Sequence, residues 1–250
     1  MTPREEPDVR VPERPRHRMV DRVAAILEEV ARSGSGMTLT AIATSLRAPV
    51  SSTQGLVNGL VATGYLDEAD RVYTLGMAPY LLNVIAGRPP VTHIPHEALE
   101  AINAETGMVT VLSAAVGDDL FYVDHVSADP AFAYLAENRL RRSLLRTSAG
   151  WLLLASRENR DLWAYLNGRP ESDAGRVDAF LSALAEIRET GICAAPGAAE
   201  RGADGVSVAV TERGQVIASV GVIGSSGSID SRRDELVEIL RRHVDAWNLD

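Results

Sequence analysis

The sequence contains no lysine, so all 25 of its basic residues are arginine, a bias that reflects GC-rich coding more than the fold. It contains one cysteine, Cys193, which excludes an internal disulfide and gives no support for secretion. The longest apolar runs, such as WLLLA at 151–155, are far too short to span a membrane, and the first residues contain no apolar signal-peptide core. We therefore expect a cytoplasmic protein that does not associate with a membrane.

The sequence also lacks the motifs of several enzyme classes. There is no G-x-x-x-x-G-K-[ST] phosphate loop, no G-x-G-x-x-G between a strand and a helix, and no G-x-S-x-G serine nucleophile. The close pair His93 and His96 has no cysteine nearby and makes a poor metal site, so we interpret both as solvent-facing loop residues. Asp118 and Asp119 would point to opposite faces of a hairpin and are interpreted as a solvated turn. We expect no enzyme activity, no metal and no cofactor.

Two other features allow both a functional and an ordinary interpretation. The adjacent Arg141 and Arg142 can meet an anionic ligand, but we favour a surface or interface role for them. Cys193 lies in a stretch rich in alanine and proline, which predicts a loop. We expect its thiol to be buried or inert rather than reactive.

Charge is distributed unevenly along the chain. Residues 1–88 hold 10 arginines and 10 acidic residues, whereas residues 89–250 hold 15 arginines and 24 acidic residues, a net charge of −9. Attraction to phosphate dominates nucleic-acid binding, so the acidic second part should not contact nucleic acid. If any part of the chain binds DNA, it is the first third.

Two helices are predicted at the start of this first third. Apolar residues within 20–30 follow the i, i+3, i+4, i+7 spacing of a core-facing stripe, and the GSG run at 34–36 ends that helix. Thr38 is then placed to cap a second helix, with Leu39, Ile42, Ala43 and Leu46 on its inner face. The residue before Pro49 is pushed out of helical conformation, which breaks the chain there.

A third helix and a hairpin follow. Ser51 or Ser52 is placed to cap the helix, which Gly64 ends. Tyr65-Leu66, the polar turn DEAD at 67–70 and the run RVYTL at 71–75 then predict a small hairpin. Three helices and a hairpin make a winged helix-turn-helix.

The rest of the chain predicts a linker and a second domain. We expect an apolar linker helix at 76–90, whose face would pack on a partner chain. Beyond it come strand pairs that turn at Gly117-Asp118 and at Arg213-Gly214, with helices between and after them. Helices around an antiparallel sheet make an α+β sensor-type domain. The expected domains are a disordered arm at 1–17, the winged helix-turn-helix at 18–76, a linker helix and loop at 77–95, and an effector-binding domain at 96–250.

Three motifs in a fixed order carry a resemblance. They are the wing GYLDEADRVYTLG at 64–76, the segment TSAGWLLLA at 147–155, and IRETGI at 187–192 followed by Glu200, Gly202 and the last strand pair. Together they resemble the isocitrate lyase regulator (IclR) family of bacterial transcription factors, over roughly residues 20–228. The resemblance implies a dimer or tetramer, a winged helix-turn-helix, and a C-terminal GAF-like domain that binds a small effector, often a carboxylate or an aromatic catabolite.

The third helix departs from the pattern that this family commonly shows, Pro-Lys-Ser-Thr-Val-x-Arg-Leu-Leu. Val50 stands where lysine is usual, and Gly55 stands where arginine is usual. Loss of that arginine removes a charge-assisted contact worth about 1.5–3 kcal/mol. Gly55 and Gly59 each lower helix propensity by about 1 kcal/mol relative to alanine.

We nevertheless expect this helix to bind DNA, weakly per monomer and with the help of avidity in an oligomer. Glutamine and asparagine amides pair with adenine edges, serine and threonine contact bases or phosphates, and arginine contacts phosphate. Ordinary capping and solvent exposure are the alternative for the Ser-Ser-Thr-Gln run. The predicted DNA-binding residues are Arg47, Ser51, Ser52, Thr53, Gln54, Asn58 and Arg71.

The effector site departs from the family pattern as well. Where the last strand often carries Ser-x-Ser before a glycine, this chain reads GVIG at 221–224. Ser148 replaces the usual alanine, Trp151 replaces the usual lysine, and the family's thiol position falls near Asp204. A site with fewer hydroxyls and more apolar surface should favour an effector larger or more apolar than glyoxylate, or none. The predicted effector-binding residues are Ser148, Ala149, Gly150, Trp151, Asp204, Gly221 and Ile223, with core packing as the alternative for Trp151.

The prediction is therefore a DNA-binding transcriptional regulator, with repression favoured by family habit. Its expected partners are a double-stranded DNA operator, a small-molecule effector and further copies of the chain, because two half-sites need two reading helices at a fixed spacing. The alternative is a regulator-derived sensor or interaction protein with weak or lost sequence-specific DNA binding. Binding that falls steeply with salt favours the first.

Overall fold

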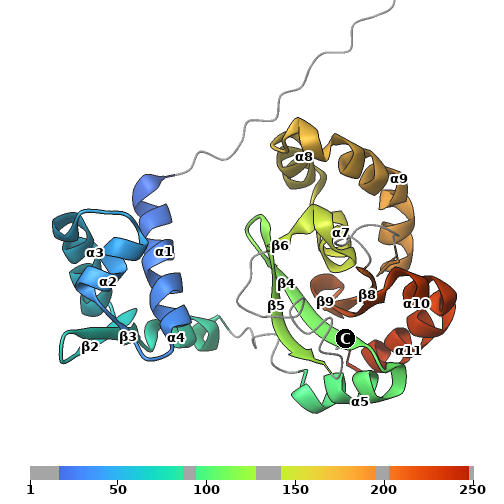
Figure 1. Cartoon of the computed structure of the whole chain (residues 1–250), viewed down its shortest axis with the longest axis horizontal. Helices are drawn as coiled ribbons and strands as arrows, with labels where there is room; N and C mark the ends of the chain where they lie inside the picture. Colours follow the sequence, from blue (N-terminus) through green and yellow to red (C-terminus); the bar gives the residue numbers. More distant parts are fainter. Residues whose placement is uncertain (1–16, 87–93, 128–141, 195–202, 248–250) are drawn as a thin grey trace, which may run out of the picture. The chain divides into compact units, whose positions relative to one another are not determined.

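The computed structural model describes residues 17–86, 94–127, 142–194 and 203–247 (Figure 1). The chain divides into two compact units, Arg14–His93 and a unit that contains Ile94–Asp250. The predicted arm at 1–17 lies outside the described residues apart from His17, and so do His93 and Arg141.

Within residues 17–86, three helices and a small antiparallel sheet form the predicted winged helix-turn-helix, and a fourth helix follows it (Figure 1). The helices are α1 (Arg18–Ser33), α2 (Leu39–Ser45), α3 (Val50–Ala62) and α4 (Ala78–Ile85). The strands are β1 (Met37–Thr38), β2 (Leu66–Ala69) and β3 (Val72–Leu75), in the order β1-β3-β2.

Local hydrogen bonds set where α2 and α3 begin. Thr38 Oγ1 accepts a hydrogen bond from the amide of Ala41 at 3.3 Å, which confirms the predicted cap of α2. The predicted serine cap of α3 is wrong. That helix begins directly after Pro49, whose carbonyl accepts the amide of Thr53 at 3.1 Å, so the serines already lie inside the first turn.

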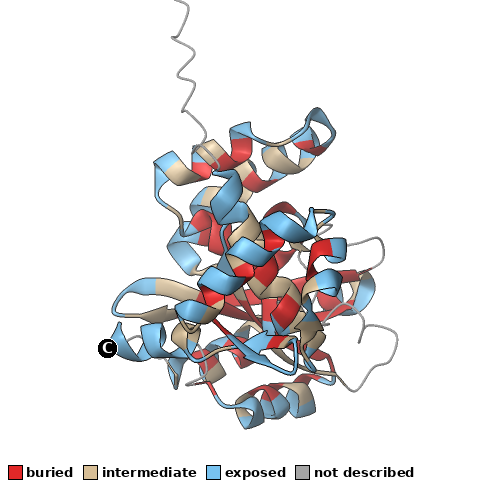
Figure 2. Cartoon of the chain, turned by 90° about the vertical axis from the view of Figure 1, so that its left-hand side faces the viewer, coloured by how far each residue is buried: buried red, intermediate tan, exposed pale blue. Residues whose placement is uncertain are grey.

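One apolar core holds the N-terminal unit together. It collects the inward stripes of α1, α2 and α3 and closes them with side chains of the two wing strands, while the outer faces of the helices stay exposed (Figure 2). Its buried members are Ile26, Val30, Ile42, Val57, Leu60, Leu66 and Tyr73.

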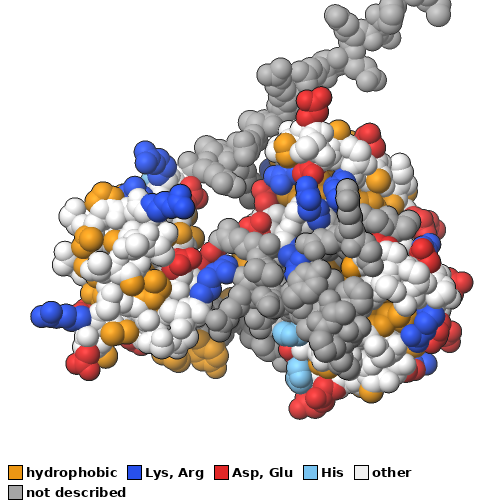
Figure 3. All heavy atoms as spheres, viewed as in Figure 1, with side chains coloured by type: hydrophobic (Ala, Val, Ile, Leu, Met, Phe, Trp, Pro, Cys, Tyr) orange, Lys and Arg blue, Asp and Glu red, His pale blue; other side chains and the backbone are white. Residues whose placement is uncertain are grey.

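The fourth helix, α4, lies outside this core. None of its eight residues is buried, and its large apolar side chains, together with Met77, are between 51% and 71% exposed. Apolar side chains are visible where this helix lies (Figure 3). An apolar surface of this kind marks an interaction site more often than a free face.

In the described part of the C-terminal unit, six strands form one antiparallel sheet in the order β6-β5-β4-β9-β8-β7. The strands are β4 (Val109–Val116), β5 (Asp119–Val126), β6 (Arg142–Ser143), β7 (Ile192–Cys193), β8 (Ala203–Glu212) and β9 (Gln215–Ser225). Both predicted hairpins are confirmed, since Val116 pairs with Asp119 and Glu212 pairs with Gln215.

Helices cover both faces of this sheet (Figure 1). The helices are α5 (His96–Thr106), α7 (Ser148–Ala155), α8 (Asn159–Asn167), α9 (Ala174–Thr190), α10 (Ser226–Ser231) and α11 (Arg233–Asp245), with 3-10 turns η3 (Leu144–Arg146) and η4 (Glu171–Asp173). The chain closes with α11, and the short helix α10 lies between the last strand and α11. No helix in the described part of the chain is long and apolar enough to cross a membrane.

Side chains alternate between the two faces along each strand. A Cβ atom placed on Gly205 of β8 would meet Ser148 of α7, whereas one placed on Gly224 of β9 would meet Ile229 of α10. We name the face covered by α7 the inner face, and the face covered by α10 the outer face. The inner face and α7 share one apolar core, and all eight residues of α7 are buried.

Cys193 corrects one prediction and confirms another. It lies on strand β7, paired with Ser207 of β8, and not in a loop. The alanine and proline that suggested a loop follow it in the chain. Its thiol is buried, as predicted.

Candidate DNA interface and effector site

The outer surface of α3 is polar and open. Ser51, Gln54 and Asn58 are all exposed. With about 3.6 residues per turn, Ser51, Gly55 and Asn58 form one stripe along the helix, and Gln54 lies beside it. A Cβ atom placed on Gly55 or on Gly59 would meet nothing within 4 Å. Amide and hydroxyl groups on such a surface can hydrogen bond to base edges in a DNA groove.

Thr53 was predicted to contact DNA, and that prediction is wrong. Its side chain is 2% exposed, and its hydroxyl donates to the carbonyl of Pro49 at 3.0 Å. Thr53 lies one turn before the core residue Val57, so the same helical face turns both inward. Ser52 is exposed, but its hydroxyl also donates to the Pro49 carbonyl, at 3.0 Å.

The two predicted phosphate-contacting arginines lie in turns before and after α3. Arg47 has φ +49° in the α2–α3 turn, where its amide donates to the carbonyl of Thr44 at 3.0 Å. Arg71 has φ +62° in the β2–β3 turn, next to Asp70 at φ +51°. Both arginine side chains are exposed. Glycine would adopt these left-handed conformations at lower cost, which is consistent with a role for the two side chains.

The wing adds little positive charge. Arg71 is accompanied by the exposed Asp67, Glu68 and Asp70, and basic and acidic side chains lie near one another on this unit (Figure 3). Burial, and then the charge and hydrogen bond of Glu68, raise the pKa of Tyr73, so this tyrosine stays neutral. Attraction to phosphate must therefore come mainly from single arginines.

In the C-terminal unit, the predicted Ser148 has a partner that the sequence did not suggest. Its hydroxyl lies 2.9 Å from the hydroxyl of Ser207, and both residues are buried. Ser207 pairs with Gly221 across β8 and β9, where a Cβ atom on Gly221 would lie 2.5 Å from the Ser207 hydroxyl oxygen. The two glycines of this region, Gly205 and Gly221, make room for the serine pair.

The neighbouring candidate residues on α7 already make hydrogen bonds or packing contacts within the domain. The amide of Gly150 donates to Thr147 Oγ1 at 2.9 Å, the N-cap bond of α7, so this amide is occupied. The indole of Trp151 donates to the carbonyl of Leu145 at 3.0 Å and packs edge-on against Phe180 at 5.7 Å. Core packing, the alternative interpretation, therefore describes Trp151. Ala149 is buried in the same helix.

Asp204 lies on the wrong face for the predicted site. Gly205, Ser207, Gly221 and Ile223 share the inner face, whereas Asp204 pairs with Gly224 and shares the outer face with it. A shift of one residue along a strand moves a side chain to the opposite face. Asp204 is therefore separated from Ser148 by the sheet, and its assignment to the same site is wrong.

Two further buried serines lie on the inner face, and neither is among the predicted effector residues. Ser113 of β4 pairs with Ser219 of β9, both are fully buried, and neither hydroxyl has a hydrogen-bond partner within the described residues. Ser219 lies two and four residues before Gly221 and Ile223 on the same strand, so the sequence alone could have placed it on the same face. The pairing of β4 with β9 brings Ser113 beside it, and the sequence did not show that pairing.

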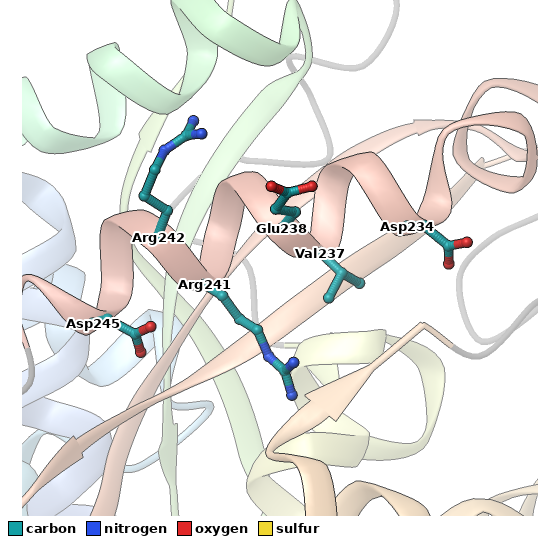
Figure 4. A pocket seen from close by; sticks show the side chains of 6 residues that line it. All are labelled: Asp234, Val237, Glu238, Arg241, Arg242 and Asp245. Carbon is teal, nitrogen blue, oxygen red and sulfur yellow. The ribbon is translucent and has the colours of Figure 1, made fainter.

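A hollow on α11 is lined by Asp234, Val237, Glu238, Arg241, Arg242 and Asp245, all from that one helix (Figure 4). None of the predicted effector residues belongs to it. Across the described ranges, no three His, Cys, Asp or Glu side chains are grouped so that they could hold a metal ion.

Comparison with known families matches this arrangement over most of the chain. The IclR helix-turn-helix domain matches residues 19–70, and the C-terminal domain of the bacterial transcriptional regulator IclR matches residues 85–248. The chain belongs to the IclR family of bacterial transcriptional regulators. IclR-family regulators bind DNA and are not enzymes, in agreement with the missing catalytic motifs.

Solved IclR-family structures share the fold. An IclR homologue from Microbacterium hydrocarbonoxydans, complexed with 4-hydroxybenzoate, is 22% identical with a TM-score of 0.64, and the match covers 91% of this chain and 99% of that one. An IclR regulator from Silicibacter sp. TM1040 is 18% identical with a TM-score of 0.69, covering 91% and 94%. Thermotoga maritima IclR is 18% identical with a TM-score of 0.53, covering 92% and 98%. A search of curated protein sequences gave no significant match.

Proposed function

We propose that this IclR-family regulator is a repressor that reads operator DNA with α3 and loses or gains DNA affinity when an effector binds its C-terminal domain. The observation that carries the proposal is the open polar face of α3, with Gln54 and Asn58 exposed, between two turns that expose Arg47 and Arg71. Amides supply base contacts and the arginines supply phosphate contacts.

The proposal includes a homo-oligomer. Two half-sites require two copies of α3 at a fixed spacing. The exposed apolar side chains of α4 supply a surface that a second copy can cover. Each monomer lacks cations in α3, so simultaneous binding of two or more copies supplies affinity that one copy lacks.

The proposed effector binds at the inner face of the sheet, near the Ser148–Ser207 pair and the unpaired hydroxyls of Ser113 and Ser219. Buried hydroxyls without partners carry an energetic cost that a ligand can offset. The surrounding core is apolar, which favours a ligand with an apolar body over glyoxylate. The Microbacterium homologue was solved with an aromatic hydroxy acid, and we propose an aromatic effector for this chain too.

The proposal is tested first by gel-shift binding to the DNA upstream of the gene that encodes the protein, and to a pool of genomic fragments, at about 50 and 200 mM salt. We expect tight binding that resists competitor DNA and weakens with salt, because phosphate contacts release counterions. Arg47→Ala and Arg71→Ala should each lower the salt slope by about one.

The Gln54→Ala, Asn58→Ala double variant should lose competitor-resistant binding. Gln215→Ala is the matched control, since it removes an exposed amide from the β8–β9 turn of the other unit. Failure of the wild-type protein to select any fragment from the genomic pool would refute sequence-specific binding and favour a sensor or interaction protein.

Effector control is tested separately by thermal shift with aromatic acids and with glyoxylate. A ligand at 100 times its Kd stabilises the folded state by about 2.7 kcal/mol. We expect an aromatic acid to raise the melting temperature of the wild-type protein and to change its gel shift, and glyoxylate to do neither.

A further inference from the structure

The surface of α3 restricts which bases it can read. Every residue from Pro49 to Leu66 is uncharged, so no arginine or lysine occurs in that segment. Guanine presents two acceptors in the major groove, and arginine or lysine is the side chain that usually pairs with both. Adenine presents one acceptor and one donor, which match the amide of glutamine or asparagine.

The hydroxyl groups of α3 are largely engaged within the helix. Those of Ser52 and Thr53 donate to the carbonyl of Pro49, each at 3.0 Å. Directly after the helix, that of Thr63 donates to the carbonyl of Gly59 at 2.8 Å. In the middle turns of α3, Gln54 and Asn58 are therefore the exposed polar side chains that can pair with two atoms of one base.

The spacing of these two amides fits neighbouring base pairs. Four residues along a helix span about 6 Å, and successive base pairs are about 3.4 Å apart, so the two amides lie within about two base-pair steps. Gly55 and Gly59 beside them carry no side chain and meet nothing within 4 Å. Bare backbone at these positions lets the helix lie close to the groove floor, which the short Asn58 needs.

We infer that α3 is an adenine reader: Gln54 and Asn58 each pair with one adenine, and each operator half-site carries two A·T pairs within about two steps of each other. α3 makes no two-atom contact to guanine. The inference rests on the proposed function, because it concerns how the DNA is recognised.

The test is selection of binding sites from a random double-stranded DNA library by the full-length protein, followed by sequencing. We expect half-sites with adenine enriched at two nearby positions. Gln54→Ala should remove the adenine preference at one of them and Asn58→Ala at the other. Each substitution should lower the enrichment of adenine over the other bases at its position by roughly 5- to 150-fold. Gln54→Arg should replace adenine by guanine at the Gln54 position. Gln215→Ala, which removes an exposed amide from the β8–β9 turn of the other unit, is the control and should leave the preferences unchanged.

The outcomes separate the inference from the proposed function. If the wild-type protein enriches no sequence, the regulator proposal fails and the inference fails with it. If a sequence is enriched but its base preferences survive both alanine substitutions, or G·C pairs occupy the positions that they affect, the adenine reader is refuted while sequence-specific DNA binding stands.

Discussion

The outer face of α3 and the inner face of the C-terminal sheet carry similar small polar side chains in opposite settings. Ser51, Gln54 and Asn58 on α3 are exposed. Ser113, Ser207 and Ser219 on the sheet are buried at 0–2% exposure. Water satisfies the first set in the free protein, so these groups are available to a partner at little cost. The second set must find partners inside the protein or lose hydrogen bonds.

The same difference governs the glycines of the two regions. Gly55 on α3 has open space where a side chain would be, whereas Gly150 on α7 packs directly against the backbone of Leu144. An exposed helix surface leaves open space around its glycines. A closed interior uses glycine to bring backbones together.

The largest effect should come from Gly150→Ala. Its new methyl group would overlap the carbonyl oxygen of Leu144, which is backbone and cannot move away alone. Overpacking of this kind costs roughly 3 kcal/mol. Gly55→Ala should instead raise stability by up to about 1 kcal/mol, because alanine favours helix. Calorimetric unfolding measures both, with Gly175→Ala of α9 as an open control in the same unit as Gly150. Equal effects at positions 55 and 150 would abolish the contrast.

The Ser148–Ser207 hydrogen bond should follow in size. Ser148→Ala or Ser207→Ala leaves one buried hydroxyl unpaired, at a cost of about 1–3 kcal/mol. Removing both hydroxyls removes the unpaired group too, so the double variant should lose less stability than the two single variants together. Urea unfolding of the three variants gives the coupling energy, and strict additivity would show that the two hydroxyls do not interact.

How far the sequence leads can be judged from these residues. The helix-turn-helix, the two hairpins and the cap at Thr38 depend on neighbours in the chain, and local patterns predicted them. The prediction that Thr53 contacts DNA was wrong because it relied only on the presence of a hydroxyl group. The spacing of Thr53 from Val57 places its side chain in the core.

The arrangement of the candidate effector residues was harder to predict because strand register decides it. A glycine or serine motif shows which residues lie near one another in the chain, but not which face of a sheet they occupy. For this reason the prediction grouped Asp204 with residues of the opposite face and did not include Ser113. The partner of Ser148, 59 positions away, follows from packing between α7 and β8, which no local pattern contains.

A smaller effect of opposite sign is expected at the other inner-face serines. Ser113→Ala and Ser219→Ala each remove a buried hydroxyl without a partner in the described residues, so each should leave stability unchanged or raise it by up to about 1 kcal/mol. Unfolding without ligand tests this, and Ser207→Ala serves as the comparison that should destabilise. A loss above about 1 kcal/mol at Ser113 or Ser219 would mean that its hydroxyl is satisfied in the free protein, by a buried water for example.

The smallest effect on stability should come from breaking a polar contact between exposed side chains. His96 Nδ1 lies 2.9 Å from Asp124, with side chains 52% and 33% exposed. The hydrogen bond and charge of Asp124, with smaller contributions from Glu100 and Glu97, raise the pKa of His96. Because the pKa is higher in the folded state, protonated His96 stabilises the folded protein fully at pH values below the unfolded-state pKa of about 6.5. This stabilisation is lost as the pH rises through the folded-state pKa.

Exposure to water should keep this contribution below about 0.5 kcal/mol. Asp124→Asn removes the charge but keeps an oxygen for the amide of His125, which Asp124 Oδ1 accepts at 2.8 Å. We therefore expect a small difference in urea midpoint between Asp124→Asn and wild type at about pH 5.5, and no difference at about pH 8.5. A difference in midpoint that is the same at both pH values would exclude His96 protonation as its cause, since only the protonated imidazole is attracted to the carboxylate.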